Sequence, residues 1–384
     1  MLIDTYQMNI VLFYHSLLSD WNHGNAHFLR GIVRELEQNG HLVRVYEPVG
    51  GWSLQNLLDS YGEAKLDELQ QYYPGLSTNF YQLDSLNLDE VLQGVDLVLV
   101  HEWNDHELVR RVGAHRAQHD YRLLFHDTHH RAVTERQSMA AYDLTHYDGV
   151  LAFGQVIRDL YLREGWTQRA WTWHEAADTS VFYPHKRPAA GYAGDLVWVG
   201  NWGDEERTAE LHEFLLKPVK ALGLKAKVYG VRYPKHALQA LAEAGIEYGG
   251  WLPNYQAPEE FAKYKVTVHV PRRPYVEALP GIPTIRPFEA LACGIPLISS
   301  PWDDAEHLFT PGQDFLVART GAEMQQHLQA LITEPEKAAE LARHGLATVL
   351  ARHTCAHRVR ELEGICQELG IADSKVIPKG IAVA

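Results

Sequence analysis

Cysteine, long apolar runs and surplus positive charge are all scarce in this 384-residue sequence. The three cysteines, Cys293, Cys355 and Cys366, are odd in number and lack the short spacings of a metal site. We therefore expect reduced thiols in a cytoplasmic protein. The amino-terminal end shows no basic region followed by an apolar run and a cleavage site, so no signal peptide is predicted.

Neither a membrane span nor a nucleic-acid partner is expected from the composition. Segment 96–100 is only as long as a strand, and no apolar run approaches the thickness of a bilayer. With 49 acidic and 35 basic residues the net charge is −14, which argues against long nucleic-acid backbones. No unit recurs at a fixed period, so solenoids and propellers are excluded. A composition that is 46% hydrophobic and 22% charged is typical of soluble proteins, and the length suits two domains.

Strand-like and helical segments alternate from end to end, which is typical of parallel α/β sheets. The expected strands are 9–14, 42–46, 97–101, 123–126, 149–152 and 170–173, then 196–200, 226–229, 246–248, 266–270, 296–299 and 314–317. The expected helices are 26–38, 156–164, 206–222, 236–244, 323–332 and 335–344. Gly40 and Gly345 are the expected stops of two of these helices, and 50–84 is an insertion with at least one helix. The pattern predicts two Rossmann-like domains that face a cleft.

Segment 281–297 carries the most specific pattern in the chain: a loop, a short helix, a glycine stop and a buried strand. Pro287 suits the first helical turn, where its missing N–H is harmless, and Gly294 suits a left-handed residue after the helix. Small residues around Cys293 let such a helix lie close to a sheet. Glu289 then points toward the N-terminus of this helix.

The start of this helix has groups that suit both ends of a nucleoside diphosphate. The amides of Thr284 and Ile285, together with Arg286, can receive an anionic diphosphate. The Glu289 carboxylate can accept hydrogen bonds from two vicinal hydroxyls, as a ribose offers. The alternative is a plain βα unit with an acidic residue that the helix dipole favours.

This segment resembles the nucleotide-sugar motif of GT-B glycosyltransferases of the group-1 type, and especially of the bacterial CgeB-like, or spore-maturation, branch. In that motif a Glu is followed by seven residues, a second Glu, a small-residue helix and a strand. Glu289 stands at the second position, whereas Gly281 stands at the first. This departure leaves open how the sugar is held and whether its anomeric configuration is retained or inverted.

The resemblance implies a GT-B fold, in which two Rossmann-like domains face an interdomain cleft and a last helix crosses back to the first domain. The expected parts are an acceptor-side domain at 1–186, a nucleotide-sugar-binding domain at 187–353, and a crossover helix and tail at 354–384. Residues 178–186 look like the family's interdomain linker, and 357–369 match its crossing helix. The likeness covers nearly all of the chain and is strongest in the second half.

Residues that directly follow predicted strands are the next site candidates, because ligands of open parallel sheets sit beyond the carboxyl ends of the strands. Asn201 and Trp202 lie in a Gly-Asn-Trp-Gly turn after one strand, and Arg207 follows shortly. The turn lets the backbone approach a phosphate, to which Asn201 or Arg207 can donate. Arg272 follows another strand and can pair with a phosphate or cap the sheet edge.

The sequence Gly-Gly-Trp-Leu-Pro at 249–253 resembles the family's nucleobase pocket, in which main-chain groups read the base edge and an apolar side chain covers its face. Trp251 can be that cover, with Leu252 beside it and Tyr229 contributing from a neighbouring strand end. The alternative for Trp251 is a hydrophobic plug between the domains.

In the first half, a Gly-containing loop and a histidine-rich segment stand where the family's members contact the donor. Gly24 and Asn25 resemble the loop that touches the diphosphate or the sugar, although Asn25 also suits a helix N-cap. His126 resembles the family histidine that approaches the donor sugar, and the neighbouring Asp127 can tune its proton affinity. If the enzyme inverts configuration, the candidates for its catalytic base are His126, Asp127 and His23.

Two further interpretations of the histidine-rich segments stay open at this point. The pair His-Glu at 101–102 follows another strand and is a competing acid/base pair. Three histidines among residues 126–130 invite a metal hypothesis. No partner cluster such as His-Glu-x-x-His accompanies them, so no metal is expected.

Together these patterns predict a glycosyltransferase whose donor is a nucleoside-diphosphate sugar and whose acceptor is a glycan, a protein or a small molecule, with no cofactor. Helix N-terminal amides, Arg286 and Arg207 stabilise the departing diphosphate in this hypothesis, without a required divalent cation. The alternatives are another GT-B nucleotide-sugar enzyme, such as an epimerase or a phosphorylase, a non-catalytic sugar-nucleotide-binding protein, and a periplasmic-type binding protein. The missing signal peptide disfavours the last of these.

Overall fold

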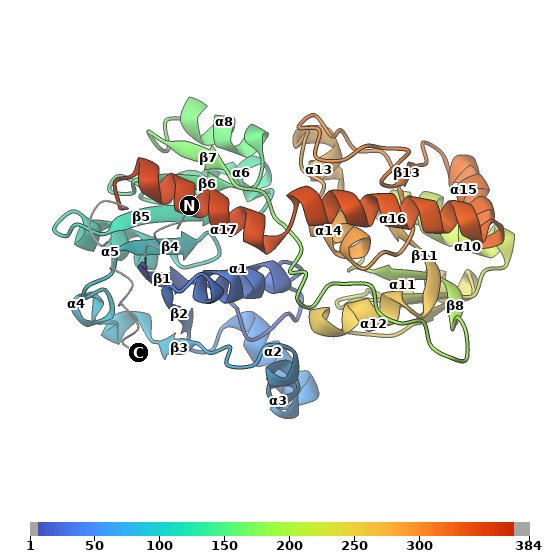
Figure 1. The fold of residues 1–384 in the computed structure, drawn as a ribbon, viewed down its shortest axis with the longest axis horizontal. Helices are drawn as coiled ribbons and strands as arrows, with labels where there is room; N and C mark the ends of the chain where they lie inside the picture. Colours follow the sequence, from blue (N-terminus) through green and yellow to red (C-terminus); the bar gives the residue numbers. More distant parts are fainter. Residues whose placement is uncertain (1–6, 372–384) are drawn as a thin grey trace, which may run out of the picture.

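Two parallel β-sheets, one built from each half of the chain, lie side by side along the longest axis of the molecule (Figure 1). The computed structural model describes residues 7–371. The first sheet has the strand order β3-β2-β1-β4-β5-β6-β7, and the second has the order β10-β9-β8-β11-β12-β13. In both sheets the chain runs outward from a central strand on one side and then on the other, which is the doubly wound, Rossmann-like arrangement. The predicted fold class of two Rossmann-like halves is confirmed.

Thirteen strands in residues 7–371 form the two sheets, and all of their pairings are parallel. The first half contributes β1 (Asn9–Phe13), β2 (Leu42–Pro48), β3 (Asn79–Tyr81), β4 (Leu97–His101), β5 (Arg122–Asp127), β6 (Gly149–Ala152) and β7 (Ala170–Thr172). The second half contributes β8 (Gly194–Val199), β9 (Ala226–Tyr229), β10 (Ile246–Tyr248), β11 (Tyr264–His269), β12 (Leu297–Ser299) and β13 (Leu316–Val317). Strand β4 is buried along its whole length, which explains its unbroken apolar sequence.

Helices cover both faces of each sheet. Those of the first half are α1 (Ala26–Gln38), α2 (Trp52–Tyr61), α3 (Ala64–Tyr72), α4 (Leu88–Val91), α5 (His106–Arg116), α6 (Arg131–Thr134), α7 (Arg136–Ala140) and α8 (Gln155–Arg163). Those that follow are α9 (Thr208–Leu211), α10 (Lys217–Leu222), α11 (Lys235–Glu243), α12 (Ala257–Phe261), α13 (Arg273–Ala278), α14 (Ile285–Ala292), α15 (Gly321–Thr333), α16 (Pro335–Arg352) and α17 (Cys355–Glu368). The predicted helix 206–222 consists of α9, a π-helical turn at His212–Leu216 and α10 in direct succession.

Helix α16 is longer than predicted, because Gly345 does not end it. Gly345 lies within the helix, and a Cβ atom there would stand 2.6 Å from the Asp314 carbonyl oxygen and 2.6 Å from Leu291 Cδ2. The predicted stop is therefore wrong: this glycine lets α16 pack closely against α14. Gly294, by contrast, follows α14 with a φ of +65°, as its predicted role as a helix stop requires.

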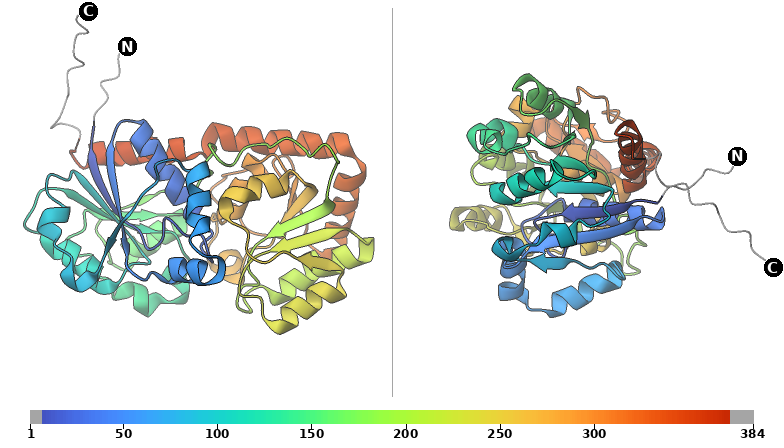
Figure 2. Two further views of the ribbon diagram at one scale, coloured as in Figure 1. Left: turned by 90° about the horizontal axis from the view of Figure 1, so that it is seen from below. Right: turned by 90° about the vertical axis from the view of Figure 1, so that its left-hand side faces the viewer.

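Helix α17 crosses back onto the first half, where it packs against α1 (Figures 1 and 2). Trp173, directly after β7, donates from Nε1 to the Arg358 carbonyl at 2.8 Å. The two places where the chain passes between the halves also touch: the Ala177 amide donates to the His353 carbonyl, and the Cys355 amide donates to the Ala177 carbonyl, both at 3.0 Å. The predicted crossing helix is confirmed.

Two further expectations from composition can be compared with the structure. Within residues 7–371, no helix combines the length and the apolar character needed to pass through a bilayer. Cys293, Cys355 and Cys366 are all buried free thiols.

Candidate active site

A cavity of about 820 Å³ lies between the two halves, a volume typical of ligand sites. Loops after β1, β4 and β5 line it from the first half, and loops after β8 and β11 line it from the second. These are the switch points of two doubly wound sheets, where such folds place ligands. The predicted residues that line the cavity are His23, Gly24, Asn25, Asn201, Arg207, Trp251, Leu252, Arg272, Thr284, Ile285 and Arg286. The predicted residues outside its lining are His126, Asp127, Trp202, Tyr229 and Glu289.

The second-half wall of the cavity carries three guanidinium groups, from Arg207, Arg272 and Arg286. Arg272 Nη1 lies 3.0 Å from a carboxylate oxygen of Glu206, and Arg286 pairs with Glu289. Arg207 donates instead to main-chain oxygens, with its Nη1 2.8 Å from the Val270 carbonyl. Its buried Nε has no hydrogen-bond partner among residues 7–371. Arg207 is thus a half-buried cation beside a cavity, with one buried donor that has no partner.

Repulsion among these arginines contributes to lowered pKa values of the basic groups in this wall. Burial and the neighbouring Arg272 and Arg286 lower the pKa of Arg207 to about 9. Burial, Arg207 and Arg286 likewise lower the pKa of His269 to about 3. An anion placed at this wall would relieve the repulsion, so the electrostatics suit a negatively charged ligand.

The N-terminus of α14 completes this wall with a strained residue. Thr284 precedes the helix with φ of 61° and ψ of 175°, a combination that β-branched residues rarely adopt. Its hydroxyl lies 3.3 Å from Nε2 of His269, and Nδ1 of that ring lies 2.9 Å from the Ser299 hydroxyl. Thr284 and Ile285 line the cavity, so the first free amides of α14 lie at its surface, where they suit an anion.

Glu289 does not reach the cavity in this structure. Its side chain is 1% exposed, with Oε1 3.1 Å from Nδ1 of His27 on α1 and Oε2 paired with Arg286. The two partners come from opposite halves, so Glu289 both orients the Arg286 guanidinium and joins α14 to α1. A ribose could reach this carboxylate only by taking the place of His27.

At the other end of the second-half wall, Trp251 and Leu252 line the cavity. Tyr61 of α2 packs on Trp251 with 4.6 Å between ring centroids, so a first-half residue already covers part of this ring. The buried Nε1 of Trp251 has no hydrogen-bond partner in the part of the chain that the structure describes. Asn201 bridges the cleft nearby, donating from Nδ2 to Asn22 Oδ1 at 2.5 Å.

Trp202 and Tyr229 follow the expected strands, but their side chains point away from the cavity. Trp202 is 1% exposed in a hydrophobic core and donates from Nε1 to the Thr208 hydroxyl at 2.9 Å. The Tyr229 hydroxyl donates to Glu260 Oε2 of α12 at 2.8 Å. Successive side chains near a strand end alternate in direction, so the strand-end rule selects the loop without selecting the side chain.

Neutral rings dominate the first-half wall, formed by His15, His23, Trp103 and His129. The rings of His15 and His23 lie 4.3 Å apart between centroids. Burial lowers the pKa of His15 to about 3 and holds the pKa values of His23 and His129 well below 6.5. These histidines are therefore uncharged at neutral pH. Sequence reasoning found His23 but missed His15 and His129, which also follow predicted strands.

His126 and Asp127 lie inside the first half and outside the cavity lining. His126 is 1% exposed and packs 4.8 Å from Trp173 between ring centroids. Burial lowers its pKa to about 3, and neither ring nitrogen has a hydrogen-bond partner among residues 7–371. Asp127 accepts hydrogen bonds from the His129 amide at 3.0 Å and the Tyr161 hydroxyl at 2.8 Å. The structure thus makes Asp127 a support for the His129 loop and does not bring either residue to the cleft.

Glu175 is a buried acidic residue of this wall that sequence reasoning missed. It lies three residues after β7, lines the cavity and is 4% exposed. Its Oε1 has no hydrogen-bond partner among the described residues. Burial and the nearby Glu289 raise the pKa of its carboxyl well above the usual range. Its position after the predicted strand 170–173 was the signal that could have found it.

Comparison with known proteins agrees with this architecture. Residues 207–364 match a protein-family model described as glycosyl transferase-like. Sucrose-phosphate synthase from Thermosynechococcus elongatus is 14% identical with a TM-score of 0.64, over 95% of this chain and 100% of that chain. Anabaena HepE in complex with UDP and glucose is 14% identical with a TM-score of 0.65, over 94% and 99%. An α-glucosyltransferase in complex with UDP and a 13-mer DNA is 11% identical with a TM-score of 0.62, over 94% and 99%.

No curated protein matches the chain in sequence. The shared architecture confirms the predicted GT-B fold over nearly the whole chain. The family match adds a glycosyltransferase domain in the half that carries the arginines, in agreement with the prediction of an enzyme of this class.

Proposed function

We propose that this enzyme transfers a sugar from a nucleoside-diphosphate sugar, with the donor bound to the second half and the acceptor held against the first. The observation that carries the proposal is Arg207, a half-buried cation whose buried Nε has no partner among residues 7–371, beside Arg272 and Arg286. A diphosphate supplies both negative charge for these guanidinium groups and oxygens that accept their hydrogen bonds. Assignment to the CgeB-like branch rests on segment 281–297 and stays a prediction.

Charge stabilisation is the main catalytic contribution that these groups offer. As the bond between sugar and diphosphate breaks, the sugar gains oxocarbenium character and negative charge accumulates on the departing diphosphate. Fixed guanidinium groups and the amides of Thr284 and Ile285 stabilise this charge without the reorganisation that water requires. In this proposal the three arginines take the role of a divalent cation, so no divalent cation is required.

A uridine diphosphate sugar is the first donor to test, since HepE, which shares the fold, was solved with UDP and glucose. In our proposal the base lies at Trp251 and Leu252, with the Trp251 ring covering its face. The acceptor is a glycan, a protein or a small molecule. The net charge of −14 disfavours a DNA acceptor of the kind bound by the α-glucosyltransferase.

If the transfer inverts configuration, a base must take the proton of the acceptor hydroxyl. Among the predicted candidates, His23 lines the cavity, and Glu175 is a buried acidic group of the same wall. His126 and Asp127 lie behind this wall and support it. His126 does so by packing, and Asp127 by accepting the hydrogen bond from the His129 amide. Glu289 remains our candidate for the ribose hydroxyls, which would take the place of the His27 ring beside Oε1.

Titration calorimetry with UDP, GDP and dTDP on the purified full chain tests the donor. We expect one of these nucleotides to bind and its sugar derivatives to be consumed, as followed by mass spectrometry with a panel of acceptors. Arg272→Ala and Arg286→Ala should each weaken nucleotide binding about 10- to 100-fold, the value of one charged hydrogen bond. Arg110→Ala, an exposed arginine of α5, is the matched control and should bind as the wild type does.

Two results would contradict the proposal. If none of the three nucleotides binds, or if the two cleft variants bind as tightly as the control, the cavity is not the donor site. Tight binding without consumption of any sugar derivative would instead indicate a non-catalytic nucleotide-binding protein.

A further inference from the structure

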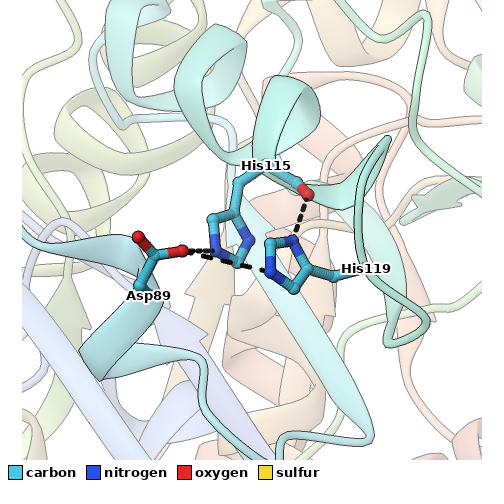
Figure 3. Close-up of side chains that lie close together, drawn as sticks. All are labelled: Asp89, His115 and His119. Carbon is cyan, nitrogen blue, oxygen red and sulfur yellow. Dashed lines mark hydrogen bonds and ion pairs between the residues drawn. The ribbon is translucent and has the colours of Figure 1, made fainter.

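Three side chains that could ligate a metal, those of Asp89, His115 and His119, lie close together in the first half (Figure 3). Asp89 lies on α4, His115 near the end of α5 and His119 one turn beyond it. One carboxylate oxygen and one nitrogen of each ring lie within 4.8 Å of one another. The cluster borders a recess of about 460 Å³ at the amino ends of β4 and β5, whereas the cleft lies at their carboxyl ends.

We propose that Asp89, His115 and His119 form a binding site for a zinc ion. Nδ1 of His119 donates to the His115 carbonyl at 2.8 Å. Nδ1 of His115 lies 3.1 Å from the Tyr121 hydroxyl, which gives its own proton to the Val112 carbonyl at 3.1 Å, so this Nδ1 is also a donor. Both rings therefore carry their proton on Nδ1 and present a bare Nε2, the form in which imidazole binds a metal.

Three electron-rich atoms meet where these side chains converge. Nε2 of His115 lies 3.2 Å from Asp89 Oδ1, and Nε2 of His119 lies 4.0 Å from the same oxygen. The two rings stack in parallel, with 3.9 Å between centroids and 5° between planes, so with both protons on Nδ1 their Nε2 lone pairs lie side by side. A rotation of the exposed His119 side chain aims its lone pair at an ion held by His115 and Asp89. A cation bound to all three atoms removes the repulsion. The alternative, a protonated histidine beside Asp89, is a surface ion pair that contributes little.

The ligand set favours zinc over the hard cations. Imidazole nitrogen suits zinc and its first-row neighbours, whereas Mg²⁺ and Ca²⁺ prefer oxygen ligands throughout. Zinc takes four ligands in a tetrahedron, so three side chains leave one position for water. Since α4 spans only Leu88–Val91 and the Asp89 side chain is 82% exposed, the bound ion would fasten this short helix to the end of α5. The place of this site at the amino ends of β4 and β5 separates it from the transfer reaction at their carboxyl ends.

Zinc titration of the metal-free full chain, in competition with a chromophoric chelator, tests the site. The wild type should bind one equivalent, and cobalt in its place should give the visible absorption of a tetrahedral complex. Asp89→Asn and His119→Gln should each weaken zinc binding by about 100-fold or more, since even second-shell changes cost about 10- to 100-fold. His146→Gln, an exposed histidine of the same half, is the control and should keep wild-type affinity.

Thermal melting separates loss of the site from loss of the fold. Without metal, all four proteins should melt alike, because Asp89 and His119 are exposed side chains. Zinc should then raise the melting temperature of the wild type and of His146→Gln but not of the other two. The proposal is overturned if the wild type binds no zinc, or if Asp89→Asn and His119→Gln bind it as tightly as the control does. Tyr121→Phe, which removes the partner of His115 Nδ1, should weaken binding by a smaller factor.

Discussion

The two walls of the cleft differ in charge. The second-half wall presents the guanidinium groups of Arg207, Arg272 and Arg286, whereas the lining from the first half contains no Arg or Lys. It contains uncharged histidine rings and the acids Asp20, Glu135 and Glu175. The difference indicates a division of work: one side concentrates positive charge for an anionic leaving group, and the other offers neutral rings and acids to an acceptor hydroxyl.

The largest expected effect tests which tryptophan of the second half faces the nucleotide. Trp202→Ala should lower the free energy of unfolding by about 3–5 kcal/mol, because it removes a buried ring from a packed core. Trp251→Ala should cost far less stability and should weaken nucleotide binding about tenfold or more, the value of one base stacked on a ring. Denaturant unfolding and calorimetry on both variants measure these effects. Unchanged nucleotide affinity in Trp251→Ala would make this residue a plug between the halves.

Glu289 contacts both halves, and a nucleotide that lacks the ribose 2′-hydroxyl tests whether it binds the ribose. We expect Glu289→Gln to weaken UDP binding about tenfold or more. We also expect it to reduce the wild-type preference for UDP over 2′-deoxy-UDP, because Gln keeps one accepting oxygen where the carboxylate offers two. Titration of both nucleotides into both proteins measures the preference. If the variant keeps the preference while binding both nucleotides more weakly, Glu289 acts only by orienting Arg286.

The smallest effect concerns the acid of the first-half wall. Burial raises the pKa of Glu175, so between the unfolded and folded pKa values the folded protein binds a proton that the unfolded chain has lost. This contribution to wild-type stability is fully present below the unfolded pKa of about 4.3 and is lost as the pH rises through the folded value. Glu175→Gln has no such loss, so its melting temperature relative to the wild type should rise between pH 4 and pH 8.

Glu107→Gln, an exposed change on α5, is the matched control for this pH series and should show no such rise. A Glu175→Gln curve that runs parallel to the wild type over the whole range would mean that the wall holds an ordinary charged carboxylate. The contrast between a wall of guanidinium groups and a wall that holds a neutral acid would then fail.

Regular elements were predictable because their burial follows a simple period. The predicted strands 149–152, 226–229 and 246–248 coincide with β6, β9 and β10, and helix 26–38 coincides with α1. The edge strand β3 escaped prediction, since it has only three residues and two of them are exposed. Gly345 misled for a different reason: a glycine needed for close helix packing looks in sequence like a glycine needed for a turn.

The candidate site was more predictable on the second-half wall than on the first. A helix start fixes Thr284, Ile285 and Arg286 at the cavity through local geometry alone, so their residue types were sufficient. On the first half, β5 extends to Asp127, one residue beyond its predicted end, so His126 stays within the sheet and the cavity receives His129. Which side chain leaves a strand end toward a ligand depends on that single residue of register.

The hydrogen-bonded contact between the two chain crossings, at Ala177 and Thr354, limits how the halves can move. A lone connecting strand would allow the halves to twist in any direction. Two crossings bonded side by side act as one hinge, so the relative motion reduces to rotation about a single axis. A rotation about this hinge widens the gap most on the side away from the two crossings.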